Sequence, residues 1–310
     1  HFRLKISSVY PSSHLYENNP QSGKNMHIND LKPFSPQQLA DAFNQAFADY
    51  FIRMHLTEEM VVGKLLAENV RLEHSVGMVH EDKLVAFILA GIDDYSGQTI
   101  AYNAGTGVLP EFRRQGLTGI MYRQLLSGLH GEGISRHRLE VMTQNVPAIK
   151  AYERVGFRRT RILSVYRGKI NSTGSTSAFE IRQTAFSSLG DIGHYWNSLP
   201  SWQNSLQAIG RTAAEHTVMA AFSPGGQLAG YIIFNPKAGK IKQLAVGKDF
   251  RKKGVGSSLL AAAGRLMQDV EVMITNVDYA DRETTAFLER KGFVCILQQY
   301  EMELEPAPVV

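Results

Sequence analysis

Three blocks of sequence occur twice in this chain of 310 residues, in the same order. The matched pairs are residues 108–116 with 246–254, residues 139–145 with 270–276, and residues 153–157 with 289–293. Ordered matches at nearly one spacing indicate a duplicated domain, and the length suits two domains of ~100–150 residues each. The duplication requires a fold that one half of the chain can form and the other half can repeat.

Composition excludes several classes of protein. The chain is 44% hydrophobic and 20% charged, which is typical of a globular protein. Its longest apolar run, residues 84–92, is far shorter than the ~20 residues that cross a bilayer, so we expect no membrane partner. No signal-peptide pattern opens the sequence, and the single cysteine, Cys295, excludes an internal disulfide. We therefore expect a cytoplasmic protein.

The positive charge is local. The net charge is +4, and the densest basic clusters, residues 113–114, 136–138, 158–161 and 251–253, are short and lie beside glycines or turns. Nucleic-acid-binding proteins carry longer basic stripes or interleaved aromatic residues. The clusters therefore favour a phosphorylated small ligand, and no nucleic-acid partner is expected.

Shifts in composition divide the chain. Residues 1–25 are polar and aperiodic and read as an extension, whose native status stays open. Residues 26–170 form the predicted first domain, the polar run 171–176 a linker, and residues 177–310 the second domain.

Hydrophobic periodicity predicts a mixed α/β order in both halves. In the first half we expect helices over 34–50 and 60–72, a hairpin of 76–79 and 84–92, a strand over 99–108, a helix over 116–129, a strand over 139–143, a helix over 147–154 and a strand over 158–167. In the second we expect a strand over 179–184, helices through residue 206, a hairpin around 223–227, strands over 241–246 and 270–275, a helix after Gly254, a helix over 284–290 and a strand over 294–304. Each half is thus predicted to be a mixed sheet with flanking helices.

The strongest chemical pattern is a strand, a basic turn and a glycine that opens a helix. Gly254 and Gly256 follow three basic residues and precede an apolar helix, so backbone N–H groups and the helix dipole can bind an anion such as a pyrophosphate. Gly116 and Thr118 hold the matching positions in the first half. The glycine spacings of nucleotide P-loops and dinucleotide-binding folds do not occur.

These residues resemble the GNAT superfamily of acyl-CoA-dependent N-acetyltransferases. The family's Arg/Gln-x-x-Gly-x-Gly/Ala motif is matched in full by residues 251–256, whereas residues 113–118 depart from it at Thr118. A second element, Asn-x-x-Ala-x-x-x-Tyr-x-x-x-Gly-Phe, is complete in the first half, from Asn145 through Tyr152 to Phe157. In the second half Leu288 replaces the tyrosine, and Asn276, aligned with Asn145, lies further from the Gly-Phe pair.

The resemblance implies two GNAT-like domains that bind acetyl-CoA as the acyl donor. The implied cofactor-binding residues are Val108, Leu109, Arg113, Arg114, Gln115, Gly116, Leu117, Thr118, Val246, Arg251, Lys252, Lys253, Gly254, Val255 and Gly256. A backbone N–H near Val108 or Leu109 would stabilise the oxyanion of the thioester. Tyr152 would be the general acid that protonates the CoA thiolate, and Asn145 would contact the pantetheine or fix the turn.

Other parts of the chemistry stay open. The general base is unassigned, with Glu140, Asp93 and Asp94 as the nearby carboxylates. No metal site is expected, because the histidines are scattered. The acceptor is expected to be a small-molecule amine, and the oligomeric state is unknown. We expect the first half to catalyse; the alternatives are catalysis or cofactor binding in the second half, or a non-catalytic acyl-CoA-binding protein.

Overall fold

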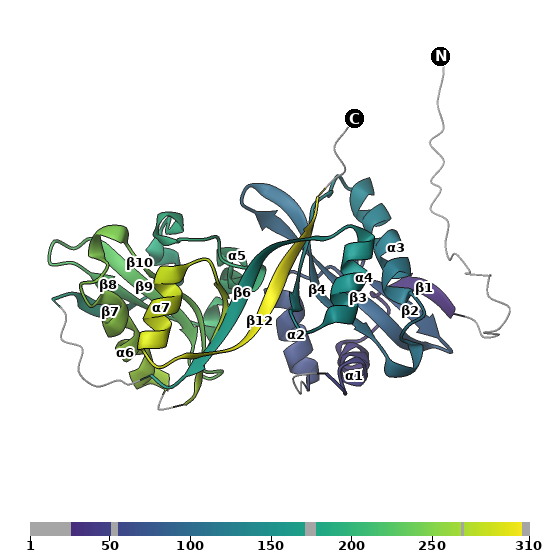
Figure 1. Cartoon of the computed structure of the whole chain (residues 1–310), viewed down its shortest axis with the longest axis horizontal. Helices are drawn as coiled ribbons and strands as arrows, with labels where there is room; N and C mark the ends of the chain where they lie inside the picture. The colour runs from purple at the N-terminus through teal and green to yellow at the C-terminus, as the bar shows by residue number, and fades with distance from the viewer. Residues whose placement is uncertain (1–25, 51–54, 171–177, 268–269, 306–310) are drawn as a thin grey trace, which may run out of the picture. The chain divides into compact units, whose positions relative to one another are not determined.

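The computed structural model describes residues 26–50, 55–170, 178–267 and 270–305 (Figure 1). The predicted extension and linker lie outside these residues. The chain forms two compact units. Among the described residues, unit 1 contains 26–50, 55–65, 70–93 and 99–135, and unit 2 contains 66–69, 94–98, 136–170, 178–267 and 270–305.

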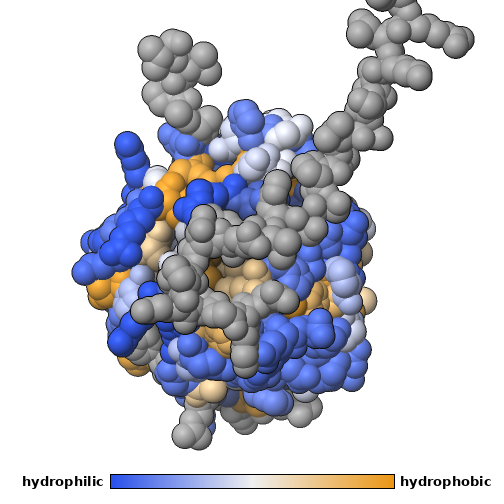
Figure 2. Space-filling view, turned by 90° about the vertical axis from the view of Figure 1, so that its right-hand side faces the viewer, coloured by the Kyte–Doolittle hydropathy of each residue, from blue (hydrophilic) through white to orange (hydrophobic). Residues whose placement is uncertain are grey.

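Unit 1 is built on four strands in the order β1 (Met26–Asp30), β2 (Val76–His80), β3 (Lys83–Tyr95) and β4 (Gln98–Val108). Its helices are α1 (Pro36–Ala46), most of α2 (Glu58–Ala67) and α3 (Leu117–Gly131). Ser35 and Gln38 form a capping box at the start of α1, which satisfies two free backbone N–H groups there. Hydrophilic residues cover most of the face of this unit seen in Figure 2 and surround smaller apolar areas.

Unit 2 contains eight of the strands that the structure describes. Their order is β5 (His137–Met142), β12 (Val294–Leu304), β6 (Arg158–Gly168), β11 (Val272–Asp278), β10 (Lys240–Val246), β9 (Leu228–Asn235), β8 (Thr217–Phe222) and β7 (Glu180–Thr184). The helices are α4 (Val146–Val155), α5 (Leu206–Arg211), α6 (Val255–Met267) and α7 (Arg282–Arg290). The predicted mixed α/β class is confirmed.

The last strand of the chain lies among strands of the first half. β12 lies beside β6 (Figure 1) and pairs with it on one side and with β5 on the other, and β6 in turn pairs with β11. Buried ion pairs reinforce this arrangement, since Glu301 of β12 binds Arg161 of β6 at 2.8 Å and Glu303 binds Arg138 of β5. The two halves of the sequence therefore share strands within unit 2.

The core of unit 2 lies on both faces of β9. Ile232 and Phe234 pack in a cluster with Leu259 of α6, whereas Tyr231 and Ile233 pack in a second cluster with Ile209 of α5. This alternation follows from the two-residue period of a strand. The sheet is thus covered on both sides.

One stretch differs from the sequence prediction. In place of the helices expected up to residue 206, the chain forms short 3-10 turns, Phe186–Leu189, Gly193–Tyr195 and Trp202–Asn204. Tyr195 and Trp202 are buried at two of these turns. Large side chains are thus buried at separate short turns and not along one face of a helix. Part of this irregular segment, residues 195–200 and 204, lines the site described next.

Candidate functional site

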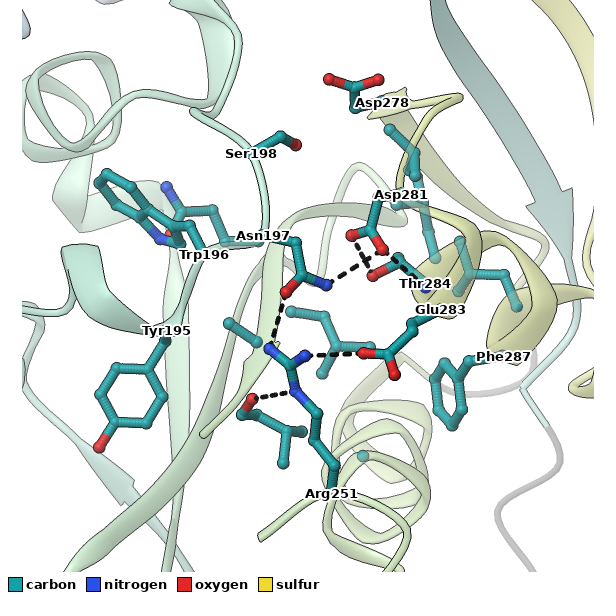
Figure 3. A pocket seen from close by; sticks show the side chains of 18 of the residues that line it. Tyr195, Trp196, Asn197, Ser198, Arg251, Asp278, Asp281, Glu283, Thr284 and Phe287 are labelled. Atoms are coloured by element: carbon teal, nitrogen blue, oxygen red, sulfur yellow. Dashed lines mark hydrogen bonds and ion pairs between the residues drawn. The ribbon is translucent and has the colours of Figure 1, made fainter. Parts of the chain in front are cut away.

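A cavity of about 800 Å³ opens in unit 2 where β10 and β11 separate (Figure 3). The two strands are parallel and pair only at Lys240 with Met273 and Ile241 with Ile274. Beyond these pairs, the register of β10 against β9 and of β11 against β6 is shifted, as in β-bulges. Bulges bend strands and leave backbone groups unpaired, so they account for an opening between neighbouring strands.

The predicted anion loop forms one end of this cavity. Lys252 and Gly254 have positive φ values of 60° and 84°, and α6 begins at Val255 directly after them. Gly254, Val255, Gly256 and Ser257 all line the cavity. The first N–H groups of a helix have no intrahelical partner and carry the positive end of its dipole, so this wall favours an anion.

Side chains near the loop add positive charge. Lys252, Arg290 and Lys291 line the cavity together with the start of α6. At Gly256 any Cβ would lie 3.2 Å from the ring of Phe287, tighter than ordinary contact, so glycine allows α6 and α7 to pack closely there. The second glycine of the motif therefore serves helix packing.

Arg251 is held within the protein. Its Nε donates to the Val246 carbonyl at 3.1 Å, and its two terminal nitrogens donate to Glu283 at 2.7 Å and to Asn197 at 2.8 Å. Asn197 also donates to Asp281 at 3.0 Å, so these side chains form a bridge visible in Figure 3. The guanidinium was predicted as a cofactor ligand, whereas its contacts tie the loop to the strand end and to α7.

The first-half loop, in unit 1, repeats this construction. Arg113 donates from Nε to the Val108 carbonyl at 3.2 Å and forms two bonds to Asp49, at 2.6 and 2.7 Å. These bonds lower the pKa of Asp49 below its ordinary value. Arg114 and Gly116 have φ values of 63° and 75°, close to those of Lys252 and Gly254. The duplication thus extends to backbone conformation.

The other residues predicted to bind the cofactor at these loops differ in burial and in hydrogen bonding. Leu117 is buried at the first position of α3, and Thr118 is partly exposed beside it. Gln115 donates to the Glu111 carbonyl at 3.5 Å, and Lys253, the matching residue of the second half, is exposed. The N–H of Leu109 donates to the Val85 carbonyl at 2.9 Å. Val108 and Leu109 are the two positions predicted to donate a backbone N–H to the oxyanion. The N–H of Leu109 already donates within the protein.

Asn145 and Tyr152 belong to α4. Asn145 is the N-cap of that helix and accepts a hydrogen bond from the Ala148 N–H at 3.2 Å. Tyr152 is only 7% exposed, with its ring edge toward Phe157 at 6.0 Å between centroids. Leu288 occupies the matching buried position of α7.

The alignment of Asn145 with Asn276 is wrong. Asp281 is the N-cap of α7 and accepts from the Thr284 N–H at 3.1 Å, as Asn145 does in α4. Asn276 instead lies inside β11 with a φ of 61° and donates to Glu140 at 2.8 Å. Since both residues are Asn and both follow a strand predicted from the sequence, sequence similarity alone could not distinguish a helix cap from a bulge.

Of the three carboxylates named above as candidates for the general base, Glu140 has a pKa displaced from its ordinary value. Burial raises its pKa to about 7, with a further contribution from Glu301, while the hydrogen bond from Asn276 opposes the shift. Its Oε2 accepts that bond, and its Oε1 is buried with no hydrogen-bond partner among the described residues. Burial therefore favours the protonated form of the Glu140 carboxyl more than in an exposed glutamate.

Several cavity residues were not anticipated as ligand contacts. Asn197, Asn204, Gln243, Thr275 and Asp281 line it. They come from the irregular segment, from the two separated strands and from the cap of α7. No residue-type pattern marks them, because their proximity depends on the bulges.

Among the residues with described structure, no group of three His, Cys, Asp or Glu side chains could hold a metal ion. Within the same residues, no helix is both long enough and apolar enough to cross a membrane.

The fold and the site together define a duplicated α/β protein in which a positive-φ glycine precedes a helix at the matching place of each half. The chain belongs to the acetyltransferase (GNAT) family, whose model matches residues 40–157 and 176–293. No curated protein matches the sequence.

Solved structures share the fold at low sequence identity. The GCN5-related N-acetyltransferase from Sphaerobacter thermophilus aligns with a TM-score of 0.72 and 15% identity over 92% of this chain and 97% of its own. A tandem GNAT protein from the clavulanic acid biosynthesis pathway aligns at 0.67 and 12% identity, over 92% and 100%. A putative acetyltransferase from Pyrococcus horikoshii aligns at 0.63 and 15% identity, over 95% and 93%.

Proposed function

We propose that this protein is an acetyl-CoA-dependent N-acetyltransferase that acts on a small-molecule amine. The observation that carries the proposal is the cavity of unit 2, which joins the glycine-opened loop to the gap between β10 and β11. Its volume of about 800 Å³ is within the ~300–1,000 Å³ typical of small-molecule sites. Family membership supports the same reaction class.

The residues of the cavity suit the chemical parts of acetyl-CoA, which supplies the acetyl group as a thioester. The N-terminal end of α6, with Lys252 and Lys291, is suited to the phosphates. The separated strands, ending at Val246 on one side, are suited to an extended arm with amide groups. Arg251 would act indirectly by holding the loop in place. The matching backbone at Arg114 and Gly116 supports a second binding loop in the first half.

The chemical step needs one proton transfer to the leaving group. The amine nitrogen attacks the thioester carbonyl, the carbon–sulfur bond breaks, and the amine gives up one proton to solvent water, because no general base is assigned. Tyr152 belongs to α4 and does not line the unit 2 cavity, so we propose it as the general acid of the first-half site, where it would protonate the departing thiolate; this assignment comes from the family motif in that half. No covalent enzyme intermediate is required.

Release of free CoA thiol, followed with a panel of small amines, tests this proposal. Tyr152→Phe is expected to lower kcat by roughly 10²-fold or more, because the phenolic proton is lost while the ring is kept. Tyr166→Phe, which removes the hydroxyl of another buried tyrosine of unit 2, is the matched control and should leave turnover unchanged.

Two results would count against the proposal. Unchanged turnover in Tyr152→Phe would exclude that residue as the acid. Binding of acetyl-CoA without thiol release from any amine would favour the non-catalytic acyl-CoA-binding alternative.

A further inference from the structure

One residue of β11 marks the place where this strand leaves β10. The parallel pairing of the two strands ends at Ile241 with Ile274. Directly after Ile274, β11 contains a bulge, because it advances three residues to Val277 while its other neighbour, β6, advances two. Asn276 lies in this bulge with a φ of 61°, a left-handed conformation that few residue types other than Gly, Asn and Asp adopt readily. The separation of β10 and β11 thus begins at the bulge that contains Asn276.

Three side chains from different elements hold the amide of Asn276. Its Nδ2 donates to Glu140 Oε2 of β5 at 2.8 Å and to Ser201 Oγ at 3.0 Å. Its Oδ1 accepts from Gln299 Nε2 of β12 at 2.9 Å. Asn276 is 7% exposed, so these contacts are largely shielded from water. The amide thus uses both of its N–H groups and its oxygen within the protein.

These bonds account for the unusual backbone at this position. A left-handed residue other than glycine persists only where its surroundings fix it, and the three bonds supply that constraint at Asn276. The neighbouring Thr275 carbonyl lies beyond the last pair with β10 and accepts from Asn204 Nδ2 at 2.8 Å. Both Asn276 and Thr275 line the cavity. The separated course of β11 is therefore stabilised by side chains from other elements.

We propose that Asn276 is a positioning residue for the second-half site: its three hydrogen bonds keep β11 in the bulge that holds this strand apart from β10. The assignment rests on the proposed function, since the opening that it maintains is the proposed acyl-CoA site. Asn276 acts through the strand and need not touch the ligand. Because β5 belongs to the first half of the sequence, Glu140 makes the shape of a second-half cavity depend on a first-half residue.

The test titrates two ligands calorimetrically into the full chain carrying Gly116→Glu, a change that is expected to block the first-half loop. Acetyl-CoA needs the space between the strands, whereas adenosine 3′,5′-bisphosphate has the nucleotide end alone and needs only the loop at Gly254. Asn276→Asp keeps the size of the side chain and its tolerance of a left-handed φ, but it replaces the N–H donor that faces Glu140 by a carboxylate oxygen. We expect acetyl-CoA to bind roughly 10-fold more weakly and the affinity for the bisphosphate to change less than about 2-fold.

A second change should restore the site. Glu140→Gln can donate to the added carboxylate, so the double variant exchanges donor and acceptor and should bind acetyl-CoA within about 3-fold of the parent chain. Glu140→Gln alone should alter neither affinity, because glutamine still accepts from Asn276. Asn235→Asp is the matched control: the Asn235 amide also donates to a glutamate, Glu215, at 3.3 Å, and it does not line the cavity. This control should also leave both affinities unchanged.

Three results would overturn the assignment. Equal weakening of both ligands, or a loss that Glu140→Gln does not restore, would show that Asn276 supports the fold in general. Unchanged affinities would show that it does not maintain the opening. If thermal melting shows that the Asn276→Asp chain is unfolded, Gln299→Met replaces it, because methionine cannot donate to Asn276 Oδ1, and the same selective loss is expected.

Failure of the proposed function would be seen separately. If the parent chain, with Asn276 intact, did not bind acetyl-CoA, the proposed function of this site would fail, and hydrogen exchange without ligand would decide the positioning role. Exchange of the backbone N–H groups of β11 should be about 10-fold faster in Asn276→Asp than in the parent, and Glu140→Gln should restore it. Unchanged exchange would overturn the positioning role as well.

Discussion

At the scale of single residues, β5, which stands at one end of the strand order of unit 2, carries the carboxyl group of Glu140. Glu140 has its pKa raised from 4.5 to about 7 by burial, with Glu301 adding to the shift. The folded state therefore binds this proton more tightly than the unfolded state does. Its contribution to stability is complete below pH 4.5 and is lost as the pH rises through 7.

Glu140→Gln should remove this dependence. A glutamine can still accept the hydrogen bond from Asn276 and carries no charge at any pH. We expect the free energy of unfolding at pH 8 to be higher in the variant by about 1–3 kcal/mol, and similar in the two proteins at pH 4.5. Urea unfolding at the two pH values measures this difference.

The buried His137 does not disturb the comparison. Burial lowers its pKa to about 3, so it destabilises the fold as the pH falls below 6.5, equally in both proteins. Parallel pH profiles for the variant and the unmodified chain would contradict the assignment to Glu140.

Residue chemistry could be predicted from the sequence only in part. The glycines of residues 251–256 predicted the turn that opens α6, which the structure has, whereas anion binding at this turn stays a prediction. The role of Arg251 could not be predicted, since its partners Asn197 and Glu283 are distant in the sequence. Asn204 carries no motif at all.

At the scale of elements, local pattern predicted most strands and helices. The strand predicted over residues 294–304 and the hairpin around residue 225 were confirmed as β12 and as β8 with β9. The helix predicted up to residue 50 ends earlier, at Ala46. The helices predicted before residue 206 failed because Tyr195 and Trp202 pack as separate anchors, which periodicity does not distinguish from a helix face.

Two glycines near the start of α3 should respond in opposite ways to alanine. Gly116 has a φ of 75° with open space around its Cβ position, so Gly116→Ala meets backbone strain alone and should destabilise the protein by about 1–2 kcal/mol. Gly119 lies inside the helix, also with open space around its Cβ position. Gly119→Ala should therefore raise the free energy of unfolding by about 0.5–1 kcal/mol. Urea unfolding of the two variants measures both effects, and equal effects would contradict the left-handed conformation at Gly116.

At the scale of the whole molecule, the duplication could be predicted from the sequence. The insertion of β12, from the second half, between β5 and β6 of the first half could not. Three repeated blocks identify two related halves. Residues 294–304 are predicted as a strand from the sequence, yet the neighbours of this strand, β5 and β6, are set by long-range register. The division into domains of residues 26–170 and 177–310 stays a prediction from the sequence. In the structure, β6 pairs with β11 and β12 pairs with β5, so strands of the two halves are neighbours.

Because β12 pairs with both β5 and β6, we expect that residues 26–170 do not fold alone. Without β12, Arg138 and Arg161 lose the carboxylates of Glu303 and Glu301, and β5 and β6 lose a shared neighbour. A domain's net stability is only about 5–15 kcal/mol, so the loss of these ion pairs together with the strand that pairs with both β5 and β6 is a large part of it. The fragment should be insoluble when expressed alone and soluble when co-expressed with residues 171–310. A monomeric fragment with a cooperative thermal transition would contradict this account.

The central claim, that the loop at Gly254 binds acetyl-CoA, is tested most directly by calorimetric titration of two variants of one residue. Gly254→Ala and Gly254→Glu impose the same strain at a φ of 84°, and nothing within 4 Å obstructs either side chain. Only the glutamate adds a negative charge at the proposed phosphate position. The account predicts that the alanine variant keeps its acetyl-CoA affinity within about 3-fold, whereas the glutamate variant loses roughly 100-fold or more at one site. Equal affinities in the two variants would contradict it.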